Sequence, residues 1–88
     1  MMIMEYEVKH LPAEHRFVVE IDGNLAHVDY VIENGALDIR HTIVPKPLEG
    51  QGIASALVGA AYAYADAHGL SRKATCPYAV VWLQRHRV

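Results

Sequence analysis

A short turn between a strand-like run and an alanine-rich run has residue types that could bind an anion. The turn, residues 44–54, contains two prolines and the glycines Gly50 and Gly52, and the helical run 55–68 follows it. Backbone N–H groups at the start of a helix have no acceptor within the helix, and the helix dipole adds partial positive charge there. Glycine lets a phosphate group approach the backbone closely. We therefore expect this turn to hold a pyrophosphate.

Two better-known phosphate-binding loops do not fit this turn. A Walker A loop ends in Gly-Lys-Ser/Thr, and the turn has no such lysine. The dinucleotide fingerprint needs three glycines after the first strand of a parallel sheet. Here there are two glycines, and the preceding strands are predicted to form a meander. A purely structural role for the two glycines remains the alternative interpretation.

Two side chains near the predicted site could take part in a reaction. Cys76 directly precedes a predicted helix N-terminus, which favours the nucleophilic thiolate, although it could instead be a small buried residue beside Pro77. His41 could deprotonate an amine, directly or through water, or be a half-buried strand residue. Asp38 and Glu33 are weaker candidates for a base, and we expect both to be solvated.

The elements that must position these groups follow from the hydrophobic periodicity. The predicted elements are strands at residues 3–8, 16–21, 25–33, 36–44 and 70–75, a loop at 9–15, and helices at 52–68 and 78–86. Turn signals at residues 22–24 and 34–35 join three strands in an antiparallel meander. A strand–helix–strand unit usually closes in parallel, so the fifth strand should lie parallel to the fourth. We expect one α+β domain spanning residues 1–88.

The same periodicities predict which side chains face the core. The residues of the first helix expected to face the sheet are Ile53, Leu57, Ala60, Ala61, Tyr64 and His68. The residues of the fourth strand expected to share one face are Leu37, Ile39, His41 and Ile43.

The composition excludes several classes of protein. With 88 residues, 52% of them hydrophobic, the chain can form one small core, which a bound ligand or a homodimer would help to stabilise. A formal charge of −2 with scattered cations disfavours nucleic-acid binding. No apolar run is long enough to cross a membrane, and the N-terminus lacks a signal-peptide pattern. The single cysteine fits the cytoplasm, and the histidines lack metal-ligand spacing, so we expect no metal.

Residues 48–58, Leu-Glu-Gly-Gln-Gly-Ile-Ala-Ser-Ala-Leu-Val, resemble the acetyl-CoA-binding motif of the GNAT superfamily of N-acetyltransferases, Gln/Arg-x-x-Gly-x-Gly/Ala. Gly52 takes a glycine position of that motif and Ala54 its final small position. The Val-Pro pair before the turn matches the end of the family's fourth strand. Residues 76–86, a Cys-Pro-Tyr start and a short helix ending in Gln-Arg-His, look like the minimal single-domain branch.

The resemblance implies a fold, a ligand and an activity. The fold would be a mixed, mainly antiparallel sheet whose fourth and fifth strands are parallel and splayed. Acetyl-CoA would donate an acetyl group to an unidentified amine, with the thioester near His41 and Cys76 and its carbonyl polarised by a backbone N–H near Val44. The residues whose backbone would bind acetyl-CoA are Gly50, Gln51, Gly52, Ile53, Ala54 and Ser55 at the pyrophosphate and Thr42, Ile43 and Val44 along the pantetheine arm.

The chain departs from the family pattern at several positions. Glu49 stands where the motif has Gln or Arg, and should weaken pyrophosphate binding unless it points away or pairs with Lys46. Trp82 stands nearest to the tyrosine that many members use as an acid, and Tyr78 lies a turn earlier. The cations of residues 85–87 could attract the 3′-phosphate of coenzyme A or form a solvated helix end.

These residues predict an acetyl-CoA-dependent N-acetyltransferase. Typical members of the superfamily begin with a strand and two helices that shape the acceptor site, and here only residues 9–15 could replace them. The acceptor site should therefore be open, to a protein tail as readily as to a small amine. The alternatives are a CoA-binding or acyl-CoA-binding module with little or no transfer activity, and a small interaction domain whose glycine turn is only structural.

Overall fold

A computed structural model of the protein describes residues 6–86. The strands are β1 (Lys9–Leu11), β2 (Arg16–Ile21), β3 (Asn24–Glu33), β4 (Ala36–Ile43) and β5 (Ser71–Ala74). The α-helices are α1 (Ile53–Ala67) and α2 (Pro77–Arg85), and the single 3-10 turns are η1 (Pro12–Glu14) and η2 (Lys46–Leu48).

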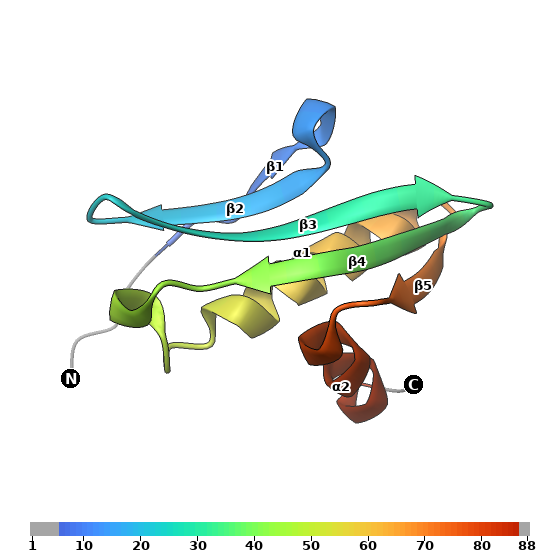
Figure 1. The fold of residues 1–88 in the computed structure, drawn as a ribbon. Coiled ribbons are helices and arrows are strands. Elements are labelled where there is room, and N and C mark those ends of the chain that lie inside the picture. The colour runs from blue at the N-terminus through green and yellow to red at the C-terminus, as the bar shows by residue number, and fades with distance from the viewer. Residues whose placement is uncertain (1–5, 87–88) are drawn as a thin grey trace.

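The strands form one sheet in the order β1-β2-β3-β4-β5, so each strand lies beside its neighbour in sequence (Figure 1). The first four strands are antiparallel, and β5 is parallel to β4. The hairpin turns at Asp22-Gly23 and Asn34-Gly35 have positive φ at both residues, which matches the right-handed twist of the flanking strands. The predicted meander and the parallel fifth strand are confirmed.

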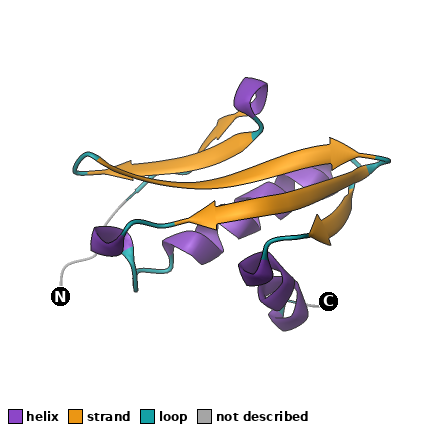
Figure 2. Ribbon diagram, viewed as in Figure 1, coloured by secondary structure: helices purple, strands orange, loops and turns teal. Residues whose placement is uncertain are grey.

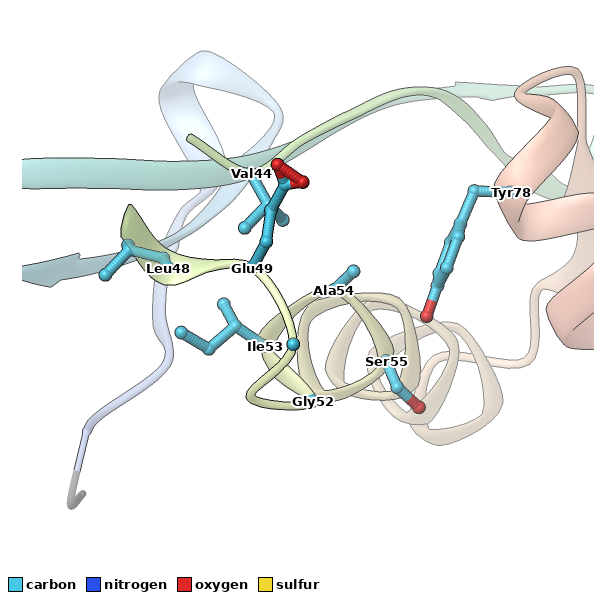
Figure 3. A pocket seen from close by; sticks show the side chains of 9 residues that line it. Val44, Leu48, Glu49, Gly52, Ile53, Ala54, Ser55 and Tyr78 are labelled. Atoms are coloured by element: carbon cyan, nitrogen blue, oxygen red, sulfur yellow. The ribbon is translucent and has the colours of Figure 1, made fainter. Parts of the chain in front are cut away.

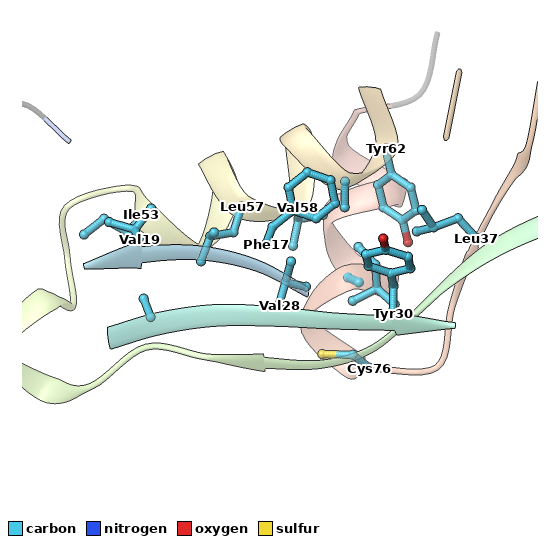
Figure 4. Packing of buried hydrophobic residues seen from close by; sticks show 14 of the residues in the cluster. Phe17, Val19, Val28, Tyr30, Leu37, Ile53, Leu57, Val58, Tyr62 and Cys76 are labelled. Carbon is cyan, nitrogen blue, oxygen red and sulfur yellow. The ribbon is translucent and has the colours of Figure 1, made fainter. Parts of the chain in front are cut away.

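Helix α1 lies along one face of the sheet, behind it in Figure 2, and forms the core with β2, β3 and β4. Figure 4 shows this core between helix and sheet. The buried residues of α1 are Ile53, Leu57, Val58, Ala61, Tyr62 and Ala65. No helix within residues 6–86 is both long and apolar enough to span a membrane.

The predicted inner face of α1 is therefore partly wrong. Ala60 and Tyr64 are only half-buried, and His68 is exposed. Tyr62, which was not predicted, is fully buried and donates its hydroxyl to the carbonyl of Lys73 at 2.6 Å. Because alanine and apolar residues surround this helix on most sides, its periodicity does not define a single inner face.

A bulge in β4 reverses which side chains of its second half face the core. Tyr30 of β3 pairs with Ile39 and Asp29 pairs with His41, so Arg40 has no partner on β3. An extra residue reverses the alternation of side chains. The prediction that His41 shares a face with Ile39 is therefore wrong: His41 is exposed, and Ile43 is 50% exposed.

The N-terminal strand also differs from the prediction of a strand at residues 3–8 and a loop at 9–15. Residues 1–5 lie outside the described residues, and residues 6–8 are not in a strand. Strand β1 pairs His10 with Phe17 of β2, and the His10 ring stacks on Phe17 at 4.0 Å between centroids. His10 Nε2 lies 2.6 Å from the hydroxyl of Tyr30. Because histidine does not count as apolar in a hydrophobic pattern, the inward-facing His10 gave no signal for a strand, and β1 was predicted as a loop.

Candidate functional site

The glycine turn leads into α1 with the backbone geometry that an anion site needs. Gly50 and Gly52 have φ values of 78° and 76°, in the left-handed region that favours glycine. Gly52 is the N-cap of α1 and brings no side chain to its first amides. The amide of Ala56 donates to the carbonyl of Gly52 at 3.0 Å, as the first bond of the helix. The amides that precede it in the first turn remain available to a ligand.

These amides border a pocket of about 290 Å³ (Figure 3). The residues that line it are Val44, Leu48, Glu49, Gly50, Gly52, Ile53, Ala54, Ser55 and Tyr78. Six of the nine predicted acetyl-CoA contacts are in this lining, and Thr42, Ile43 and Gln51 are not. The side chain of Gln51 turns back and donates to the carbonyl of Pro47 at 3.2 Å. Tyr78 reaches the pocket from the first turn of α2, with its ring directed toward α1.

Glu49 is the acidic residue of this lining. Its side chain is exposed, and Figure 3 shows the carboxylate beside Val44, on the far side of the pocket from Ser55. Within residues 6–86, no ion pair joins Glu49 to Lys46. The predicted ion pair with Lys46 is therefore absent from the described residues, and the carboxylate lies at the Val44 side of the pocket.

A second pocket, of about 200 Å³, adjoins the first and shares Ser55 and Tyr78 with it. Its other lining residues are Val81, Trp82 and Arg85 of α2 and His86, the C-cap of that helix. The indole N–H of Trp82 donates to the hydroxyl of Ser55 at 2.9 Å, and the indole stacks on His86 with centroids 3.9 Å apart. The two pockets together form a groove that runs from the glycine turn along α2.

Strands β4 and β5 stop pairing beside this groove; we call their divergence the wedge and their last residue pair its vertex (Figure 1). Their last pair is Ile39 with Ala74, after which the amides of Thr75 and Cys76 both donate to the carbonyl of Ile39 at 3.0 Å. Cys76 is the N-cap of α2 and is 7% exposed. Its thiol donates to the hydroxyl of Thr42 across 3.5 Å. The sequence thus placed Cys76 correctly at the end of the fifth strand.

His41 and Cys76 lie on opposite sides of β4. Thr42, which contacts the thiol, pairs with Val28 of the core. The neighbouring His41 pairs with Asp29 on the face of the sheet that α1 does not cover, which we call the open face. The Asp29 carboxylate accepts hydrogen bonds from Arg16 at 2.6 Å and from His27 at 3.0 Å. The two predicted reactive side chains therefore do not form a cysteine–histidine pair.

Asp38 was predicted to be solvated, and this is wrong. It is 2% exposed and accepts hydrogen bonds from Thr75 and Arg40. Glu33, predicted to be solvated as well, has a side chain that is 54% exposed. The only sequence signal for the buried carboxylate is the proximity of Arg40, two residues along the strand. Among residues 6–86, no group of acidic, histidine or cysteine side chains is arranged to hold a metal ion.

Comparison with known proteins supports the fold and shows the family of the chain. No curated protein is significantly similar to the chain in sequence. The chain is similar to the NMR solution structure of a GCN5-like protein from Staphylococcus aureus, with 30% identity and a TM-score of 0.71. The match covers 90% of this chain and 78% of that one. Residues 16–88 match the family model of the GCN5-related N-acetyltransferases. The chain therefore belongs to the GCN5-related N-acetyltransferase family.

Proposed function

We propose that this protein is an acetyl-CoA-dependent N-acetyltransferase. The observation that carries the proposal is the uncapped start of α1 at Gly52, which opens into a pocket of about 290 Å³ beside the wedge. An anion site at a helix N-terminus next to a gap between parallel strands suits a ligand with a pyrophosphate and an extended arm.

Coenzyme A would lie along the groove in three parts. Its pyrophosphate would accept hydrogen bonds from amides of residues 50–55. Its pantetheine arm would pair with the backbone of residues 42–44 and carry the thioester into the wedge. Its nucleotide end would occupy the second pocket, where Arg85 supplies positive charge for the 3′-phosphate and the stacked rings of Trp82 and His86 offer aromatic surface.

The transfer would form one C–N bond and break one C–S bond. The acceptor amine attacks the thioester carbonyl and loses a proton, and the coenzyme A thiolate leaves and gains one. We assign His41 as the base, because it is exposed on the open face from which an amine can approach. We assign Tyr78 as the acid, because its phenol lines the pocket and Trp82 has no proton of useful acidity.

Cys76 would contact the acyl group at the vertex of the wedge. In a covalent route, its thiolate would take the acetyl group from coenzyme A and pass it to the amine. In a direct route, its small, buried side chain would shape the acyl site. Intact mass after incubation with acetyl-CoA separates these routes, because only the covalent route gives an acetyl adduct that Cys76→Ser loses. This free thiol also suits a reducing compartment, and we place the protein in the cytoplasm.

A thermal-shift comparison tests the binding step. Acetyl-CoA should raise the melting temperature, because a ligand that binds only the folded state stabilises it. S-acetylpantetheine, which keeps the thioester and lacks the pyrophosphate, should raise it far less at the same concentration. The absence of a shift at millimolar acetyl-CoA would overturn the proposal. Release of coenzyme A in the presence of a panel of small amines and peptides then separates an enzyme from a silent acyl-CoA-binding module.

A further inference from the structure

A buried carboxylate joins the two strands at the vertex of the wedge. The hydroxyl of Thr75 donates to Asp38 Oδ1 at 3.0 Å and to Oδ2 at 2.9 Å, and Arg40 Nε donates to Oδ2 at 2.8 Å. Arg40 is the bulged residue of β4, and Thr75 directly precedes Cys76. One side chain therefore contacts both the bulge of β4 and the residue at which the chain leaves β5.

The environment of Asp38 makes these contacts strong. Its side chain is 3% exposed, so water contributes little to its solvation. The guanidinium of Arg40 balances its charge and also donates to Glu33 at 3.3 Å. Asp38 is the buried partner and Arg40 is 39% exposed, so the loss of a donor to Asp38 leaves a buried carboxylate under-satisfied, which costs more than the loss of an exposed pair. Both carboxylate oxygens are used, and no buried side-chain N or O atom within residues 6–86 lacks a partner.

We propose that Asp38 is a positioning residue for acyl transfer, which sets the splay of β4 and β5 through Arg40 and Thr75. The catalytic consequence rests on the proposed acetyltransferase function, whereas the geometry of the wedge can be tested without turnover. Asp38 does not line the groove, so it acts through the strands and not by touching coenzyme A. Small displacements of reacting atoms reduce rates steeply, so a loosened vertex should slow the transfer.

The first test uses Cys76 as a reporter, because it is the one cysteine of the chain. Asp38→Asn and Thr75→Val should each raise the rate at which a small neutral alkylating reagent labels the thiol, by about tenfold or more. Thr75→Ser keeps the hydroxyl and should label at the rate of the unmodified protein. Thr75→Val also keeps the test decisive if Asp38→Asn does not fold.

Two control variants separate a local opening from a general loss of stability. Asp66→Asn removes a carboxylate that is paired with Arg72 at 2.6 Å but is 53% exposed, and it should leave labelling unchanged. Val58→Ala destabilises the core between α1 and the sheet and leaves the hydrogen bonds of Asp38 in place. The proposal is overturned if the labelling rate of Cys76 depends only on the free energy of unfolding. In that case Val58→Ala and Asp38→Asn, at equal stability, would be labelled equally fast.

The second test uses an amine that the unmodified protein acetylates. Asp38→Asn should lower kcat by about tenfold or more and change the Kd of acetyl-CoA far less, because Asp38 lines neither pocket of the groove. An unchanged kcat would overturn the positioning role. If the unmodified protein neither binds acetyl-CoA nor turns it over, the proposed function fails, and the labelling test still decides whether Asp38 holds the vertex.

Discussion

Trp82 donates its indole N–H to the hydroxyl of Ser55 at 2.9 Å, and this bond joins α2 to the first turn of α1. Ser55 lies where the helix start should receive a pyrophosphate, and Trp82 lies in the wall of the second pocket. The same indole would lie 3.5 Å from a Cβ added at Gly59 of α1, and it packs on Tyr62 with ring centroids 5.6 Å apart. Both ends of the proposed coenzyme A site are therefore held by one packed side chain.

Replacing Trp82 by Phe should weaken both folding and ligand binding. The smaller phenyl ring keeps most of the apolar contact beside α1, but the indole N–H and its hydrogen bond are lost, at a cost of about 1 kcal/mol in the free energy of unfolding. Ser55→Ala should cost a similar amount, and the double variant should cost little more than either single one. Urea unfolding and acetyl-CoA titration of all three variants measure the coupling. Fully additive losses would show that the bond contributes nothing.

Replacing Glu49 by Arg should tighten acetyl-CoA binding. The change removes an exposed negative charge from the pocket lining and adds a positive one near the expected pyrophosphate, which should improve Kd by about fivefold at low salt. The gain should shrink as salt is added, because exposed charges are screened. Glu14→Arg, on the exposed turn η1, makes the same change in net charge and should not improve binding. Unchanged or weaker binding in Glu49→Arg would mean that the turn is misinterpreted.

Much of the fold could be predicted because local signals agreed with one another. The Asp22-Gly23 and Asn34-Gly35 turns fixed the meander, and the helix between β4 and β5 fixed their parallel pairing. Gly50 and Gly52 marked the start of α1, where both are left-handed. Each of these features depends on a few neighbouring residues, so the sequence contains the information directly.

The missed parts of the site depend on long-range contacts. The sequence of β4 alternates without a visible break at the bulge of Arg40. Arg40 pairs with Asp38, and Asp38 is bound by Thr75, which is far away in sequence. For this reason, two predictions failed: that His41 shares a face with Ile39, and that Asp38 is solvated. Tyr78 was not among the predicted site residues, because its place in the pocket depends on how α2 packs against α1.

Alanine at Gly52 and at Gly59 should have opposite effects on stability. Gly52 has a φ of 76°, and an L-residue there costs about 1–2 kcal/mol although no atom would contact the added methyl group. Gly59 lies inside α1, where alanine is favoured over glycine by about 1 kcal/mol. The added methyl group would lie 3.5 Å from Trp82, which is an ordinary van der Waals contact. Thermal unfolding of the two variants makes the comparison. A stabilised Gly52→Ala would contradict the left-handed turn.

Acid should destabilise the protein through His10. Burial first and then the charge of His68 lower the pKa of His10 from its usual 6.5, so the folded protein binds fewer protons than the unfolded chain below that pH. The free energy of unfolding should therefore fall as the pH drops through 6.5 toward the folded pKa, and be regained as it rises. In urea unfolding between about pH 7 and pH 5, His10→Phe should show a smaller fall than the unmodified protein. His41→Gln, at an exposed histidine, should keep the full fall, and an equal fall in His10→Phe would rule out His10 as the origin.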